Sequence, residues 1–219
     1  MSPIVVHHLE RSRSQRLLWL LEELEVDYEL KHYARTREGR APEALRAVHP
    51  LGRSPVITHG DVLIAESGAI MEYLVETLGE GRMKPEPGTD ELLRYRFFLH
   101  FAEGSMMPPL LVKLLFNRVR DAVPLLGRLI ASKVDAAYTD PEIISHLAFV
   151  DAELSGRTWL AGESLTAADV MMSYPLQAAL SRANLPGEYS HIANYIARCE
   201  ARPAYARAVE RGGPFEIPG

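Results

Sequence analysis

The spacing of apolar residues in the first eighty positions alternates between the period of a strand and the period of a helix. Residues 4–6 are a β-branched run and residues 26–30 alternate apolar with polar side chains, so both segments predict strands. Between them lies one helical face at the spacing i, i+3, i+4 and i+7, formed by Leu17, Leu20, Leu21 and Leu24. Leu18 and Trp19 widen this face, which predicts a helix with apolar contacts on two sides.

The same alternation continues to about residue 80. Residues 42–46 predict a short helix, and the apolar segments 56–58 and 62–64, joined through a Gly-Asp turn, predict a β-hairpin. A further amphipathic helix is expected to begin at Ser67. The order strand–helix–strand–helix–strand–strand–helix predicts one compact α/β domain.

The pattern changes at residues 79–89, where glycines, prolines and charged residues replace the apolar repeat and predict a linker. Beyond it only helical patterns recur, over residues 90–115, 125–137, 141–154, 167–182 and 191–201. The pair Pro108-Pro109 is expected to interrupt or kink the first of these helices. We therefore expect an α/β domain at residues 1–81, a linker at 82–89 and an all-helical domain at 90–219.

Composition narrows the class of protein. The chain has 219 residues, 47% of them apolar and 24% charged, which is typical of a globular protein. Its net charge of −5 argues against nucleic acid as a partner, because phosphate binding depends on an excess of Lys and Arg. No apolar run is long enough to span a membrane, and no secretory signal is expected. The single cysteine, Cys199, cannot form an intrachain disulfide, so a reducing cytoplasm is expected.

Several kinds of chemistry are not expected. The α/β domain contains no cysteine, so it cannot exchange disulfides through a Cys-x-x-Cys pair. His7 and His8 are neighbours on a strand and point to opposite faces, so they do not predict a metal site. The glycine spacing of a phosphate-binding loop is absent as well.

Three short segments are the candidates that are left. Ser12 and Ser14 lie where the first strand turns into the first helix, Pro55 directly precedes a strand, and the pair Glu66-Ser67 begins a helix. Each has an ordinary structural explanation, as a helix cap or a turn. The functional interpretation is that a serine hydroxyl at a helix N-terminus lies where partial positive charge favours an anion.

Taken together and in this order, the segments resemble the glutathione S-transferase superfamily over essentially the whole chain. The resemblance is carried by residues 7–21 (HHLERSRSQRLLWLL), 49–55 (HPLGRSP), 66–70 (ESGAI) and 103–110 (EGSMMPPL). Within the superfamily the chain is similar to the serine-type branch that includes fungal and bacterial Gtt-like transferases.

The resemblance implies a thioredoxin-like N-terminal domain and a helical C-terminal domain, with glutathione as a co-substrate rather than a tightly bound cofactor. Ser12 matches the serine whose hydroxyl donates a hydrogen bond to the glutathione sulfur. Ser54 is expected to precede a cis Pro55 and to pair its backbone with the cysteinyl unit. Ser67 is expected to meet the γ-glutamyl carboxylate, and Glu66 to lie near the amine.

Two arginines and a second serine are further candidates. Arg40 and Arg53 match the place of the glycyl carboxylate, which a guanidinium can bind through two hydrogen bonds, and the sequence does not choose between them. Ser14 competes with Ser12 for the role beside the sulfur. Ser12 is favoured because it lies four residues before Arg16, the spacing of the serine-type relatives.

The helical domain offers weaker signals. Thr166 and Asp169 match a capping box, a structural element in which a side chain three residues into a helix reaches back to its start. Cys199 is expected to be a packing residue. Four residues are candidates for the pocket of the electrophile, with core packing as the alternative: Met106, Met107, Leu110 and Leu111.

The expected protein is thus a cytoplasmic, homodimeric glutathione transferase that acts in detoxification on a small hydrophobic electrophile or hydroperoxide. A hydroxyl donor and a helix N-terminus that lower the thiol pKa by about 2 units supply about 2.7 kcal/mol in favour of the thiolate. Two alternatives stay open. A glutathione-dependent isomerase or dehalogenase has the same thiolate but another pocket, and a non-catalytic member binds glutathione or a protein. No metal, nucleic acid or membrane partner is expected.

Overall fold

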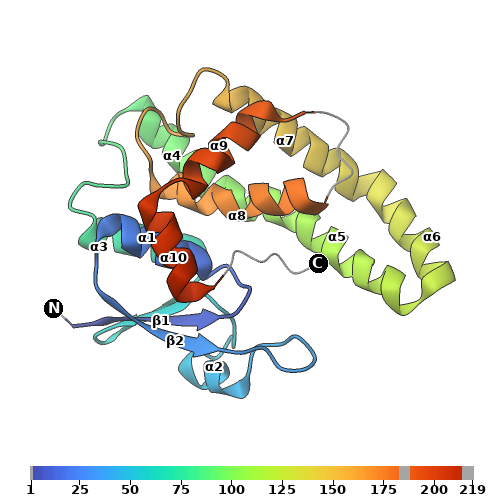
Figure 1. Ribbon diagram of the computed structural model, residues 1–219, viewed down its shortest axis with the longest axis horizontal. Coiled ribbons are helices and arrows are strands. Elements are labelled where there is room, and N and C mark those ends of the chain that lie inside the picture. The colour runs from blue at the N-terminus through green and yellow to red at the C-terminus, as the bar shows by residue number, and fades with distance from the viewer. Residues whose placement is uncertain (1, 183–187, 214–219) are drawn as a thin grey trace. The chain divides into compact units, whose positions relative to one another are not determined.

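The computed structural model describes residues 2–182 and 188–213 (Figure 1). Its contacts form two compact units, Met1–Leu92 together with Cys199–Ile217, and Leu93–Arg198, as far as these ranges are described. The domain limits expected from the sequence, at residues 81 and 90, stay a prediction.

A four-stranded sheet forms the centre of the first unit. Its strands are β1 (Ile4–Leu9), β2 (Tyr28–Tyr33), β3 (Val56–His59) and β4 (Val62–Ala65). They lie in the order β2-β1-β3-β4, with β2 parallel to β1, β3 antiparallel to β1, and β4 antiparallel to β3. All four strands, including the hairpin, were expected from the sequence. The parallel β1–β2 pair and the antiparallel hairpin give the thioredoxin-like arrangement.

The helices of this unit are α1 (Gln15–Leu24), α2 (Glu43–Val48) and α3 (Ser67–Leu78), as the apolar spacing predicts. α1 is buried over almost its whole circumference, with Leu17 to Leu21 fully inaccessible. It contacts α3 and, with its other side, the C-terminal helix α10 (Pro203–Gly212). The two-sided apolar contact predicted for α1 is therefore confirmed, although α10 itself was not predicted.

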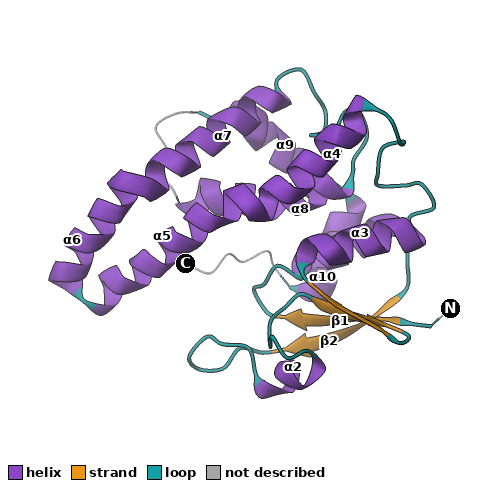
Figure 2. Ribbon diagram, turned by 180° about the vertical axis from the view of Figure 1, so that it is seen from behind, coloured by secondary structure: helices purple, strands orange, loops and turns teal. Residues whose placement is uncertain are grey.

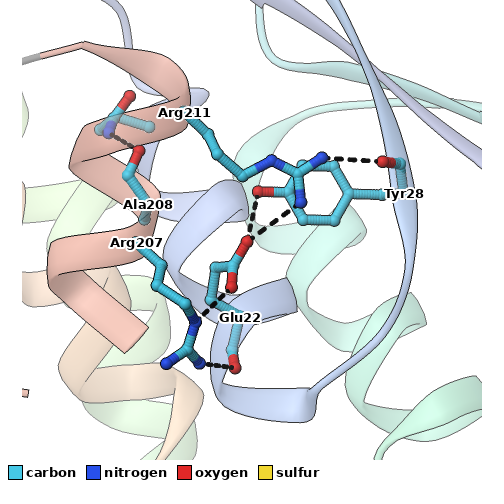
Figure 3. A network of polar contacts seen from close by, with 6 residues as sticks. Glu22, Tyr28, Arg207, Ala208 and Arg211 are labelled. Carbon is cyan, nitrogen blue, oxygen red and sulfur yellow. Dashed lines mark hydrogen bonds and ion pairs between the residues drawn. The ribbon is translucent and has the colours of Figure 1, made fainter. Parts of the chain in front are cut away.

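Ionic contacts hold α10 against α1 and β2 (Figure 3). Arg207 and Arg211 both bind the Glu22 carboxylate, with nitrogen–oxygen distances of 2.7 and 3.2 Å. Arg211 also donates to the Tyr28 carbonyl at 2.9 Å. Burial acts to raise the pKa of Glu22, but the hydrogen bonds from Arg207, Tyr28 and Arg211 outweigh it and lower that pKa. A side-chain contact adds to these, because Trp19 and Tyr205 meet edge to face at 5.2 Å.

Helices joined by loops, with no strand among its described residues, make up the second unit (Figure 2). Its elements are α4 (Asp90–Phe101), α5 (Met107–Ala122), α6 (Pro124–Val134), α7 (Asp140–Leu154), α8 (Ala167–Arg182) and α9 (Ser190–Glu200). The interruption expected in the helix of residues 90–115 is a π-helical segment, Ala102–Met106, which separates α4 from α5. It ends two residues before Pro108 and Pro109, whose missing N–H groups cannot continue the regular ladder.

The start of α8 is organised by Asp169, which is completely buried. Its carboxylate accepts hydrogen bonds from the N–H of Leu160 at 2.9 Å, the N–H of Thr166 at 2.8 Å and the hydroxyl of Thr166 at 2.9 Å. The Tyr195 hydroxyl donates as well, at 3.2 Å. Burial raises the pKa of Asp169, and these four hydrogen bonds act to lower it. The expected reach of Asp169 back to Thr166 is confirmed, while the Thr166 hydroxyl binds the carboxylate instead of a helical N–H.

Candidate functional site

Ser12 lies in the turn that joins β1 to α1. Arg11 has a φ of 49°, in the left-handed region, which turns the chain sharply after the strand. The N–H groups of Gln15 and Arg16 bond back to the carbonyls of Ser12 and Arg13, both at 3.3 Å. Because the backbone satisfies these donors, the hydroxyl of the N-cap, Ser14, makes no capping bond and is available to another partner.

The turn brings three serine hydroxyls together. Ser12 Oγ lies 2.7 Å from Ser14 Oγ and 3.4 Å from Ser54 Oγ, and it accepts the Ser14 N–H at 3.3 Å. Ser54 donates to the His7 carbonyl at 3.1 Å. Ser14 is fully buried, whereas Ser12 retains 9% of its accessible surface. Of the two competing serines, Ser12 is therefore the one that reaches the surface of its unit.

His8, which the sequence analysis did not select, fixes the inner end of this cluster. Its Nε2 lies 2.9 Å from the Gly212 carbonyl oxygen and its Nδ1 lies 2.9 Å from Ser14 Oγ. Burial lowers the pKa of His8 from 6.5 to about 4, so the ring is neutral at neutral pH. The His8 ring contacts Ser14 and Gly212, which are far apart in the sequence, so the local spacing of residues could not predict its role.

Ser54 and Pro55 lie at the entrance to β3. The Ser54–Pro55 peptide bond is cis, as the resemblance implies. Pro55 is buried directly before Val56, and Ser54 is half-buried with its hydroxyl among β1 atoms. The Leu9 N–H donates to Ser54 Oγ at 3.4 Å, so the end of β1 and the start of β3 meet at this serine.

Glu66 and Ser67 form the start of α3. Glu66 has a φ of 76°, which is uncommon for a residue with a side chain and typical of functional turns. Ser67 is buried, and its hydroxyl accepts a hydrogen bond from Arg16 Nη2 at 3.2 Å. Arg16 is itself fully buried and adds positive charge at the N-terminus of α3. In the sequence, Arg16 served only to identify Ser12, through the spacing of four residues between them.

The two arginine candidates, Arg40 and Arg53, are both exposed. Arg40 lies in the loop after β2, and Arg53 lies in the turn before Ser54. Among the contacts of the described residues, none joins either guanidinium to the serine cluster. Their assignment to the glycyl carboxylate stays a prediction.

The candidates of the helical unit divide by burial. Met106, Met107 and Leu110 are buried, while Leu111 on α5 is 44% exposed. Cys199 is fully buried and forms no disulfide, in agreement with the packing role expected for it.

Residues 2–182 and 188–213 contain neither a cluster of metal ligands nor a helix that could span a membrane. No group of three or more His, Cys, Asp and Glu side chains in this part of the chain could hold a metal ion. None of its helices is both long enough and apolar enough to cross a membrane.

Comparison with known proteins gives two family matches. Residues 1–76 match the glutathione S-transferase N-terminal domain, and residues 116–203 match the glutathione S-transferase C-terminal domain. Glutathione S-transferase 1 of Saccharomyces cerevisiae is 33% identical, over 95% of each chain. Glutathione S-transferase 3 of Schizosaccharomyces pombe is 35% identical, over 95% of this chain and 87% of its own.

Solved structures agree with these matches. The crystal structure of a glutathione S-transferase from Actinobacillus pleuropneumoniae superimposes with a TM-score of 0.82 and 36% identity, over 98% of this chain and 95% of its own. The theta class glutathione S-transferase from Xanthomonas axonopodis, solved with glutathione bound, has a TM-score of 0.74 at 24% identity, over 95% of this chain and 98% of its own, and supports the fold. The sequence and structural similarities together show that the chain belongs to the glutathione S-transferase family.

Proposed function

We propose that this chain activates glutathione through the Ser12 hydroxyl, as a serine-type, Gtt-like transferase, and conjugates the thiolate to small hydrophobic electrophiles. The observation that carries the proposal is the position of Ser12. Its hydroxyl lies at the outer end of a serine cluster, beside the start of α1, while Ser14 is buried and hydrogen-bonded to His8.

Ser12 acts on the thiol by stabilising its anion. The hydroxyl donates to the sulfur, and the partial positive charge at the start of α1 favours the thiolate over the thiol. No acidic residue lies in the first turn of α1 to cancel this charge. The released proton goes to solvent, so Ser12 is neither the nucleophile nor the base.

The remaining residues hold the peptide. The Ser54 backbone, at the cis Pro55 turn, pairs with the cysteinyl unit like an added strand. Ser67 and the N–H groups at the start of α3 bind the γ-glutamyl carboxylate, next to the buried Arg16 guanidinium. Glu66 pairs with the γ-glutamyl amine, and Arg40 or Arg53 holds the glycyl carboxylate.

Two reactions follow from the thiolate. With an electrophilic carbon, a sulfur–carbon bond forms and the leaving group departs with its electron pair. With an organic hydroperoxide, the thiolate attacks the outer oxygen and the O–O bond breaks, which gives a sulfenic acid and an alkoxide that takes a proton to leave as the alcohol. A second glutathione thiol then condenses with the sulfenic acid to give the disulfide and water. Met106, Met107, Leu110 and Leu111 stay the proposed contacts of the apolar substrate.

The proposal includes a homodimer in the cytoplasm that removes toxic electrophiles, as the family resemblance implies. It is tested by kinetics with glutathione and a nitro-activated aryl halide, and in parallel with an organic hydroperoxide. Ser12→Ala is expected to lower kcat/KM by up to about 25-fold at pH 7, since the thiolate fraction falls from about three quarters at a thiol pKa of about 6.5 to about 3% at the free value of about 8.5. Ser132→Ala, at an exposed position of α6, is the matched control. Full activity of Ser12→Ala at neutral pH would contradict the proposal.

A further inference from the structure

His8 determines the direction of the hydrogen bonds in the serine cluster. The Gly212 carbonyl can only accept, so the Nε2 that lies 2.9 Å from it must carry the proton. A neutral ring then has a bare Nδ1, which accepts the hydroxyl proton of Ser14 at 2.9 Å. The neighbours of the ring support the neutral form. His32 on β2 lies 5.4 Å away, ring to ring, and Ser14 and Gly212 carry no charge.

The same reasoning gives the direction of the hydrogen bond between Ser14 and Ser12. Because the Ser14 proton is bound to His8, the Ser14 oxygen offers an acceptor lone pair to Ser12, 2.7 Å away. The Ser54 proton is bound to the His7 carbonyl, so Ser54 Oγ is an acceptor as well, at 3.4 Å. Ser12 has one proton to donate, and the shorter distance favours Ser14 over Ser54 as its acceptor.

We propose that Ser14, held by His8, is a resting acceptor for the Ser12 hydroxyl proton that competes with the glutathione sulfur. This inference rests on the function proposed above. When a thiolate binds, Ser12 exchanges its neutral bond to Ser14 for a charge-assisted bond to sulfur, which is the stronger of the two. After conjugation the sulfur is a thioether, a weak acceptor, and the Ser12 proton returns to Ser14. Ser14 and His8 are positioning residues that give the Ser12 proton a partner whenever no thiolate is bound.

The sign of a pKa change distinguishes competition from simple support. If Ser14 competes with sulfur, Ser14→Ala lowers the pKa of the bound thiol further, by about 0.7 unit, or about a fivefold gain in thiolate at a pH below that pKa. The backbone N–H of residue 14, which donates to Ser12 Oγ, is retained in this variant. If Ser14 only supports Ser12, the pKa rises instead.

His8 offers a matched pair of variants. The Asn side-chain oxygen is attached at the same atom as Nδ1, so His8→Asn can keep the acceptor for Ser14. The Gln amide reaches the Nε2 position, so His8→Gln can keep the bond to Gly212 but removes that acceptor. With its acceptor gone, Ser14 donates to Ser12, so His8→Gln should lower the thiol pKa as Ser14→Ala does, and His8→Asn should not. In the Ser14→Ala background, His8→Gln should add no further shift.

The experiment is a spectroscopic pH titration of bound glutathione, with circular dichroism to verify folding. The inference expects the lowered thiol pKa in Ser14→Ala and His8→Gln. An unchanged or raised thiol pKa in Ser14→Ala, or a His8→Gln shift that persists without Ser14, would overturn it. If instead the wild-type thiol is not shifted, or Ser12→Ala leaves the shift intact, the proposed function itself fails.

Discussion

Two helix starts in this protein use similar polar residues in opposite ways. At α8, the negative charge is supplied by the helix itself, because the buried Asp169 carboxylate lies in its first turn and is saturated by donors from Leu160, Thr166 and Tyr195. At α1, no carboxylate lies in the first turn, and a chain of neutral hydroxyls leads from the buried His8 to Ser12.

The difference distinguishes a helix start that stabilises the fold from one that can bind a ligand. Where the helix carries its own carboxylate, and protein donors satisfy all of its oxygens, no group remains to bind a ligand and the contacts stabilise the fold. Where the positive end of the helix has no anion of its own, a bound thiolate can supply it. α3 resembles the second group, since its first turn also lacks an acidic residue, the side chain of its N-cap Glu66 makes no capping hydrogen bond, and Arg16 adds charge beside Ser67.

The largest effect is expected at α8. Asp169→Ala should lower the free energy of unfolding by about 4 kcal/mol, because it leaves several buried donors without an acceptor. Urea unfolding measures it, with Asp61→Ala at an exposed turn as the control. A loss below about 1 kcal/mol would show that the carboxylate is not the structural centre of this helix start.

The next effect is a pH dependence of stability at the α1 side. The folded pKa of His8, about 4, lies below its ordinary 6.5, so the unfolded chain binds a proton first. His8 therefore lowers stability as the pH falls from 6.5 towards 4, by up to about 3 kcal/mol in full. The pKa of His7 is lowered too, by burial and Lys31, so the comparison is with His8→Asn. Parallel pH profiles for the two proteins would contradict the buried neutral ring.

A smaller effect concerns the binding of glutathione beside α3. Arg16→Met keeps the bulk but removes the buried guanidinium, and should raise KM for glutathione about tenfold while kcat changes less. Initial rates at varied glutathione concentration test this, with the exposed Arg120→Met as the control. A fall in kcat at unchanged KM would place Arg16 at the reacting atoms instead.

The smallest effect sharpens the contrast between the two helix starts. Ser12→Ala should change the free energy of unfolding by less than about 1 kcal/mol, since Ser12 is a neutral residue at the end of the series of hydrogen-bonded hydroxyls and contributes little to folding. Thermal or urea unfolding of this variant beside Asp169→Ala makes the comparison direct. A loss as large as that of Asp169→Ala would assign Ser12 a structural role.

Much of the fold could be predicted from the sequence, because the spacing of apolar residues distinguishes strands from helices wherever the repeat is strong. The hairpin at residues 56–65 and the wide apolar face of α1 are examples. α10 was missed, although its buried residues Ala204, Tyr205 and Ala208 recur at helical spacing. Pro108 and Pro109 predicted an interruption of the helix of residues 90–115, but not its π-helical form at Ala102–Met106.

The candidate site was predictable in part. The residues of the resemblance indicated Ser12, Ser54 and Ser67, and the cis bond at Pro55 agrees with it. The residues that surround them depend on long-range contacts, such as the one from His8 to Gly212, 204 positions away in sequence. Gly212 has a further constraint, because a Cβ there would collide with the side chains of Gln15 and Leu18.

The central claim is that the Ser12 hydroxyl stabilises the glutathione thiolate, and an ultraviolet titration of bound glutathione tests it most directly. In the wild-type protein the thiol pKa should lie about 2 units below its free value of about 8.5. Ser12→Ala should raise it by at least about 1 unit towards the free value, because the variant keeps the helix start but loses the hydroxyl donor. A wild-type pKa equal to that of free glutathione, or a depression of unchanged size in Ser12→Ala, would contradict the account.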